Sequence, residues 1–211
     1  MNVPWNLVTW TRKHAYVYAH IHIHPYIGGQ WFLMDESLGS FKHVSLVFRC
    51  LVDRLHVHNR VDMIIVGGRA KWEIQDCSLW VSWGGVVSCM ESAFLSISNS
   101  VIGGTGSGDE RSVTGVTAFD ASRVGLRRCL IQQVSGAGAR FYDDAQGVLS
   151  NCTLRLCEVA LSLETQSKVL VDKSVFEENQ GANFMSSQDA SPARLQILKK
   201  SLFSDFAYET Y

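Results

Sequence analysis

Residues 72–79, with the sequence WEIQDCSL, set a pattern that recurs along most of this chain. Each copy has two apolar residues in alternation, two polar residues, a Cys or Ser that we call the anchor, and an apolar residue two places later. The copies are residues 95–102 (LSISNSVI), 124–131 (VGLRRCLI), 147–154 (GVLSNCTL) and 169–176 (VLVDKSVF). Looser copies surround Cys50 and Ser201, and successive anchors lie 22 to 29 residues apart. A period of this length indicates a stack of similar structural units.

The apolar residues of each unit alternate with a period of two, which is typical of β-strands. A second alternating pair lies 13 and 11 residues before each anchor, such as Ile64 and Val66 before Cys77. With the apolar position after the anchor, each unit therefore predicts three short strands separated by Gly-rich or polar turns. Units this short leave no room for a crossover helix, so each strand should pair in parallel with its equivalent one coil later. This predicts an all-β solenoid, a single-stranded parallel β-helix of about six to seven short coils.

The first part of the chain does not show the repeat. We therefore predict that residues 1–43 form an irregular or low-complexity N-terminal segment, in which residues 31–34 (WFLM) could cap the solenoid, and that residues 44–211 form the β-helix domain. Within that segment His20, His22 and His24 would share one face of a strand. Three imidazoles could bind a transition metal, but the biased tract also fits a low-complexity leader.

Composition narrows the choice of partners and compartment. The 211 residues include 19 basic and 20 acidic ones, a net charge of -1, which provides no electrostatic footprint for nucleic acid. No apolar run of about 18 residues and no secretory signal pattern is present, so we expect no membrane contact and a cytoplasmic location. Anchors that alternate between Cys and Ser indicate small, reduced, buried side chains, and the absence of a C-x-x-C pair argues against zinc.

Four carboxylates are the candidate site residues. Glu91, Asp120 and Asp143 each lie nine residues before an anchor, and Asp144 is next to the last of them. Stacked coils would bring them together at one turn edge, where like charges repel, and folding alone does not require such a column. Calcium bound by Glu91, Asp120 and Asp143 would relieve the repulsion. If the protein is an enzyme, Glu91, Asp120, Asp143 and Asp144 are the catalytic candidates, because paired carboxylates provide an acid and a base.

The repeat resembles the right-handed β-helix (pectin lyase-like) superfamily over roughly residues 45–203. Its coils are short, with a Cys or Ser anchor followed by a Gly-Val or Gly-Ala strand, as at Gly115-Val116 and Gly138-Ala139. In this they look most like the β-helix repeat regions of F-box ubiquitin-ligase subunits and related scaffold proteins. Asp143-Asp144 matches one polygalacturonase motif, but the N-T-D and G-H-G motifs that accompany it are missing. The resemblance implies a right-handed β-helix that binds partner proteins and does not cleave polysaccharide.

Two functions follow as expectations. The first is a noncatalytic binding or scaffold module with a protein partner and no cofactor, in which an open solenoid edge also favours edge-to-edge self-association. The alternative is a carbohydrate-active enzyme, a polysaccharide lyase or glycoside hydrolase, that uses the acidic column with or without calcium.

Overall fold

The computed structural model describes the backbone of nine stretches of the chain, and all of their secondary structure is β-strand. The stretches are residues 31–33, 38–42, 45–48, 62–81, 84–104, 112–186, 195–198, 202–203 and 208–210. Side chains are described within residues 62–81, 84–104 and 112–186. No helix long and apolar enough to cross a membrane occurs in these stretches.

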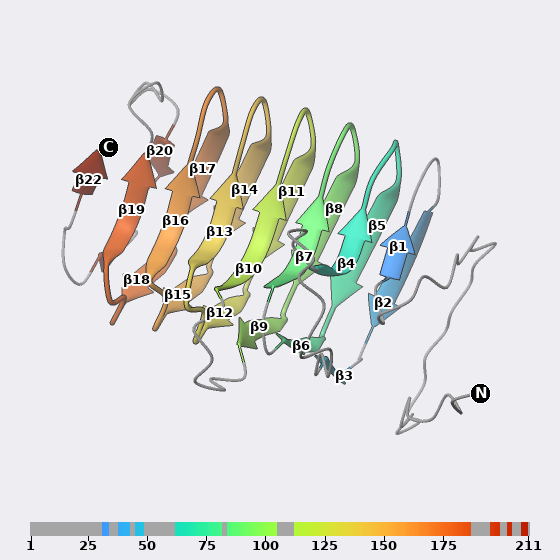
Figure 1. Cartoon of the computed structure of the whole chain (residues 1–211), viewed down its shortest axis with the longest axis horizontal. Helices are drawn as coiled ribbons and strands as arrows, with labels where there is room; N and C mark the ends of the chain where they lie inside the picture. Colours follow the sequence, from blue (N-terminus) through green and yellow to red (C-terminus); the bar gives the residue numbers. More distant parts are fainter. Residues whose placement is uncertain are drawn as a thin grey trace, which may run out of the picture.

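The strands form three parallel sheets, in which each strand pairs with its equivalents in the coils before and after it (Figure 1). Sheet A has the order β1 (Trp31–Leu33), β4 (Asp62–Val66), β7 (Gly84–Cys89), β10 (Val113–Ala118), β13 (Ala137–Phe141), β16 (Val159–Leu163), β19 (Ala182–Ser186), β22 (Tyr208–Thr210). Sheet B has the order β2 (Leu38–Lys42), β5 (Lys71–Gln75), β8 (Phe94–Ser98), β11 (Arg123–Arg127), β14 (Gln146–Ser150), β17 (Lys168–Asp172), β20 (Leu195–Leu198). Sheet C has, in chain order, β3 (Ser45–Phe48), β6 (Ser78–Val81), β9 (Val101–Gly104), β12 (Leu130–Gln132), β15 (Thr153–Arg155), β18 (Val175–Glu177), β21 (Leu202–Phe203).

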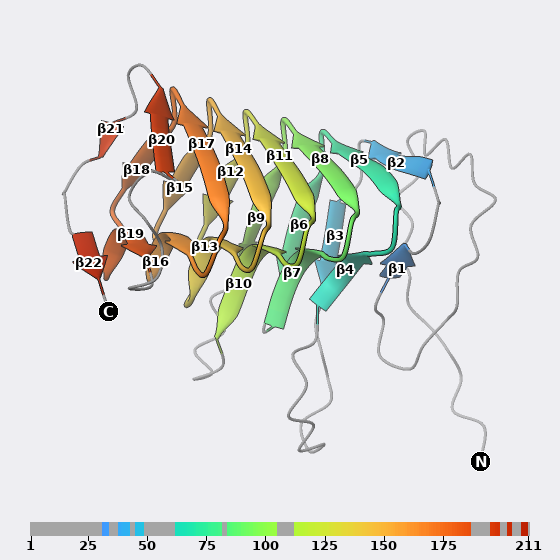
Figure 2. The ribbon, with the colours of Figure 1, turned by 90° about the horizontal axis from the view of Figure 1, so that it is seen from above.

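The chain therefore winds through sheets A, B and C in turn and repeats, as the view from above shows (Figure 2). This confirms the predicted all-β parallel β-helix. Five coils, β4 to β18, are described together with their side chains, which is slightly fewer than the six to seven expected from the anchors. The two outermost anchors, Cys50 and Ser201, lie outside the described residues, and the strands beyond β4 and β18 extend the same three sheets.

The ladder begins earlier than the expected boundary at residue 44. Strand β1 pairs with β4, and β2 pairs with β5, so both belong to the sheets of the solenoid. The histidines at positions 20, 22 and 24, and Met34, lie outside the described residues.

The interior is a set of apolar columns that run along the solenoid axis. In sheet B the burial alternates along each strand, so that Leu95, Val124 and Val169 face inward while their neighbours face out. Sheet C contributes Ile102, Ile131, Leu154 and Phe176 from the position two after each anchor, as predicted. Burial of each such side chain stabilises the fold by about 1.5–3 kcal/mol.

Each anchor follows a single residue whose φ is positive, and this residue makes the bend from sheet B to sheet C. The bend residues are Asp76, Asn99, Arg128, Asn151 and Lys173, with φ between 48° and 54°. The anchors themselves are at most 3% exposed. Where the anchor is Ser, its hydroxyl links coils: Ser100 Oγ accepts the Cys77 N–H at 3.1 Å, and Ser174 Oγ accepts the Cys152 N–H at 3.1 Å. A small polar or sulfur side chain is what this buried bend accommodates.

Two glycines provide a test of the close stacking. A Cβ on Gly138 would lie 2.7 Å from the carbonyl oxygen of Ala160 and 3.1 Å from Cys157 Sγ, whereas a Cβ on Gly125 would meet nothing within 4 Å. We expect Gly138→Ala to lower the free energy of unfolding by about 1–3 kcal/mol. The matched change Gly125→Ala should be neutral or stabilising by up to about 1 kcal/mol. Urea unfolding of both variants measures this, and equal effects would contradict the close approach of neighbouring coils at Gly138.

Candidate functional site

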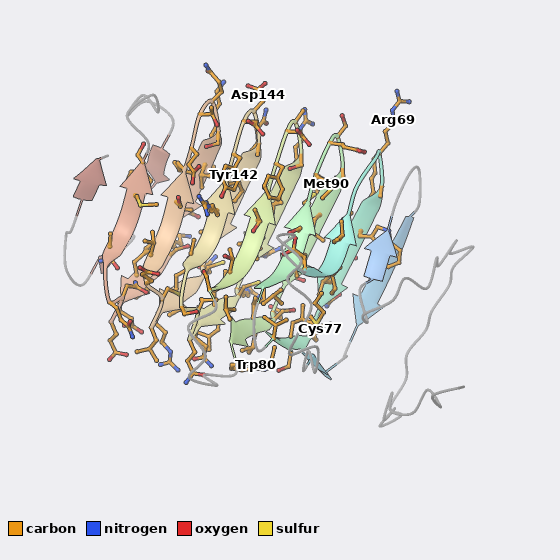
Figure 3. All side chains as sticks on the ribbon, viewed as in Figure 1. Arg69, Cys77, Trp80, Met90, Tyr142 and Asp144 are labelled. Atoms are coloured by element: carbon orange, nitrogen blue, oxygen red, sulfur yellow. The ribbon has the colours of Figure 1, made fainter. Side chains whose placement is uncertain are left out.

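Within residues 62–81, 84–104 and 112–186, five turns connect sheet A to sheet B, and their second residues form a column along one edge of the solenoid. This turn column consists of Gly68, Glu91, Asp120, Asp143 and Thr165, all with φ between 52° and 68°. The structure thus places three of the four predicted site residues in one column. Asp144 is in the next position of its turn, is exposed, and points outward from the row of turns like Arg69 (Figure 3).

The carboxylates of the turn column accept backbone hydrogen bonds from the preceding coil. Glu91 Oε2 accepts the Gly68 N–H at 2.5 Å, and Asp120 Oδ2 accepts the Glu91 N–H at 3.0 Å. Asp143 Oδ2 accepts the Asp120 N–H at the longer distance of 3.5 Å. The last step uses a neutral oxygen, because Thr165 Oγ1 accepts the Asp143 N–H at 2.9 Å.

This arrangement corrects the expectation that folding does not explain the column. The left-handed turn leaves an N–H pointing along the axis, and a backbone donor without a partner is costly. A side-chain oxygen from the next coil satisfies it, and a carboxylate is a stronger acceptor than a neutral group. Since Thr165 fills the same role, the column requires an acceptor oxygen and not a charge.

A metal site would require several of these side chains to converge on one point, which alignment in a column does not ensure. Within residues 62–81, 84–104 and 112–186, no group of three His, Cys, Asp or Glu side chains is placed to hold a metal ion. Glu91, Asp120 and Asp143 each have one carboxylate oxygen that already accepts a hydrogen bond from a backbone N–H. Calcium binding by these three, and catalysis by them with Asp144, remain predictions.

A second cluster, formed by Phe119, Arg140, Tyr142 and Glu164, links neighbouring coils on the sheet A side of the same edge. The rings of Phe119 and Tyr142 stack with centroids 5.0 Å apart and planes 5° apart, and the Arg140 guanidinium lies 4.5 Å from the Tyr142 centroid. Arg140 also forms an ion pair with Glu164 at 2.6 Å. The charges of Arg140 and Glu164 are therefore paired with each other, and the pair links two neighbouring coils.

The described cysteines are buried thiols. Cys77, Cys89, Cys129, Cys152 and Cys157 are all free. Burial raises the pKa of Cys89 and of Cys157 to about 12. In the neighbouring anchors, hydrogen bonding between the two thiols lowers the pKa of Cys129 and raises that of Cys152.

The outer face of sheet B carries a groove of about 500 Å³. It crosses the strands β8, β11, β14 and β17, and its lining residues are Phe94, Arg123, Val124, Gly125, Gln146, Gly147, Val148, Lys168, Val169 and Leu170. Val124, Gly147 and Val169 are buried, so only their backbone can form the floor.

Two rows of outward-facing residues form the walls of this groove. The register aligns Phe94, Arg123, Gln146 and Lys168 in one row. The other row contains Gly125, Val148 and Leu170. The groove therefore runs along the solenoid axis, with a polar and cationic wall on one side and an apolar wall on the other.

The groove was not predicted from the sequence. Its lining residues occupy strand positions that the repeat predicts to face solvent, and a glycine at position 125 does not by itself indicate an open space. The sequence signal was weak: Val148 and Leu170 are apolar where the equivalent position of β8 has Ser96. Only the register of the sheet shows that these residues adjoin Arg123 and Lys168.

The match to a family model supports the fold. A family model described as a right handed beta helix region matches residues 46–202. Among solved structures, the chain is similar to the tailspike protein gp49 from Pseudomonas phage LKA1, with 14% identity and a TM-score of 0.39 over 72% of this chain. The match covers 31% of the tailspike, so the chain spans less than a third of that protein's length. No curated protein matches the sequence.

The hydrogen-bonded turn column predicts how Asp120 responds to substitution. Asp120→Ala removes the acceptor of the Glu91 N–H and should lower the free energy of unfolding by about 0.5–1.5 kcal/mol. Asp120→Asn keeps an acceptor oxygen and should cost less than half of that. Urea unfolding with and without calcium measures both effects. Calcium stabilisation of the native protein that Asp120→Asn abolishes would instead support the metal site.

Burial of the thiols predicts their reactivity. At pH 8 we expect iodoacetamide to leave Cys89 and Cys157 unmodified in the folded protein and to modify both in urea, because a raised pKa leaves almost no thiolate. The folded state also holds these protons more tightly than the unfolded state, so stability should fall as the pH rises from about 9 towards 12. Peptide mass mapping and urea unfolding at several pH values measure these effects. Rapid labelling of the folded protein would contradict the assigned burial.

Proposed function

Since this chain belongs to the family of right-handed β-helix proteins, we propose that it is a noncatalytic binding module. It acts in the cytoplasm and holds an acidic segment of a protein partner in the sheet B groove. The observation that carries this proposal is the position of the exposed apolar side chains. Within residues 62–81, 84–104 and 112–186, the exposed large hydrophobic residues are Phe94 (42%) and Val148 (44%), and both line the groove. Exposed apolar groups gathered in one concave site are typical of a binding surface.

Charge selects the kind of partner. The charged residues that line the groove are Arg123 and Lys168, and both are cations. On the outer face of sheet B the carboxylates Glu73 on β5 and Asp172 on β17 do not line the groove, nor do the turn-column carboxylates three residues before the cationic row. In the described part of the chain neither cation has an ion-pair partner, so both can contact a ligand. A partner with carboxylates would complement this wall.

The lining chemistry favours binding over catalysis. General acid–base or nucleophilic catalysis needs a titratable or nucleophilic side chain within reach of the substrate. Among the lining residues Lys168 is the one side chain of this kind, and no Asp, Glu, His, Cys, Ser or Thr lies beside it in the lining to act as a second acid, base or nucleophile. The carboxylates of the turn column lie in the turns that precede these strands and are engaged with the backbone.

Poly-L-glutamate provides a defined probe of this function, with binding followed by fluorescence anisotropy at low salt. We expect the double variant Arg123→Gln/Lys168→Gln to bind about tenfold more weakly, because two exposed ion pairs contribute up to about 2 kcal/mol. Gly125→Leu should also weaken binding, since its side chain would occupy the open space above the strand. The matched control is Arg128→Asn/Lys173→Asn, which removes two cations from bends where Asn already occurs at equivalent positions.

The outcomes separate the candidate functions. Equal loss in the groove and control variants would show that net charge alone causes binding and would overturn the proposal. Polygalacturonate is the comparison for the alternative function. Its depolymerisation by the protein, and loss of that activity in Asp120→Asn/Asp143→Asn, would replace the binding module with the carbohydrate-active enzyme.

A further inference from the structure

The sheet B groove has a repeat of its own, which a ligand must match. Its cationic wall consists of residues in register on successive strands, with Arg123 on β11, Gln146 on β14 and Lys168 on β17. Neighbouring strands lie about 4.8 Å apart, so the two cations are about 9.6 Å apart along the axis. An acidic chain that lies in the groove contacts both cations only if its carboxylates recur at that distance on one face.

The regular conformations of a peptide differ in this distance. Same-face side chains of an extended β-strand recur at about 6.8 Å and then at about 13.6 Å. One turn of an α-helix rises about 5.4 Å, and two turns rise about 10.8 Å. A polyproline II helix has three residues per turn at about 3.1 Å each, so residues i and i+3 share a face about 9.3 Å apart. Polyproline II therefore matches the cation spacing most closely.

The remaining walls of the groove suit the same ligand. Phe94 at one end and Val148 and Leu170 along the other side present apolar surface for proline rings. Gly125 leaves open space beside Val148, because a Cβ there would meet nothing within 4 Å. Aromatic and apolar grooves bind proline-rich segments well, since such segments lose little conformational entropy on binding. The Gln146 amide, between the two cations, can donate to a ligand carbonyl that polyproline II leaves without an internal partner.

We propose that the sheet B groove recognises a polyproline II segment with acidic residues at every third position, aligned with the solenoid axis. This rests on the proposed function and adds the conformation and spacing of the partner's segment. The Glu side chains of such a segment would contact Arg123 and Lys168, and its prolines would lie against Val148 and Leu170.

Three synthetic peptides, each with four Glu residues in twelve, test the spacing and the conformation. The first is Glu-Pro-Pro repeated four times. The second has the same composition in the order EEPPPPEEPPPP, which breaks the three-residue period. The third is Glu-Gly-Ser repeated four times, which keeps the period without the polyproline II preference. We expect the first to bind the full-length protein at least about threefold more tightly than either other peptide. The second peptide loses an ion pair for each misplaced carboxylate, and the third loses more conformational entropy when it becomes ordered on binding.

The same measurements on variants locate the site. Arg123→Gln and Lys168→Gln should each abolish the preference for the first peptide, while Arg128→Asn/Lys173→Asn should keep it. Raised salt should weaken binding of the first peptide. Equal binding of the three peptides, lost in the groove variants, would overturn the polyproline II assignment and leave the binding module standing. A preference that persists in Arg123→Gln/Lys168→Gln would overturn the assignment to this groove. Failure of these peptides and of poly-L-glutamate to bind would overturn both proposals.

Discussion

Parallel, in-register stacking at about 4.8 Å is the constraint on which the rest of this structure depends. Every strand of the described coils has its equivalent above and below it, as in the run of β7, β10 and β13, where Val87, Val116 and Ala139 align. The size and polarity allowed at a position therefore depend less on its neighbours in the sequence than on the equivalent residues in the coils before and after it. The apolar columns make the core, and the glycines at close approaches, such as Gly138 below the Ala160 carbonyl, are required by the same spacing.

The acidic turn column shows how stacking can resemble a functional site. Three carboxylates in successive coils suggest a metal or an acid–base pair when only charge is considered. Hydrogen bonding gives them another role, because each turn presents a backbone N–H to the coil that follows. A column of like charges is tolerated where the groups are exposed and screened by water, and where each carboxylate gains a charge-assisted hydrogen bond.

The groove on sheet B arises where the stacking leaves room. Gly125 interrupts the row that continues with Val148 and Leu170, and Val148 in that row and Phe94 in the opposite row remain exposed. The backbone floor, cationic wall and apolar wall then follow the solenoid axis, so the groove has the periodicity of the coils themselves. A solenoid is suited to recognise a periodic ligand, because its backbone displays equivalent positions at a fixed interval.

The repeat of anchors by itself determined the all-β parallel solenoid, its three strands per coil, the inward columns and the small buried anchor residue, because each is a local pattern repeated at one period. It also identified Glu91, Asp120 and Asp143 as equivalent positions. It could not show that their oxygens accept backbone N–H groups, since that depends on the left-handed turn and on the coil that follows. Nor could it show that Phe94, Arg123, Val148 and Lys168, spread over 75 residues, line one groove. Only the register between coils brings these side chains together, because the spacing between anchors varies and the turns absorb the difference.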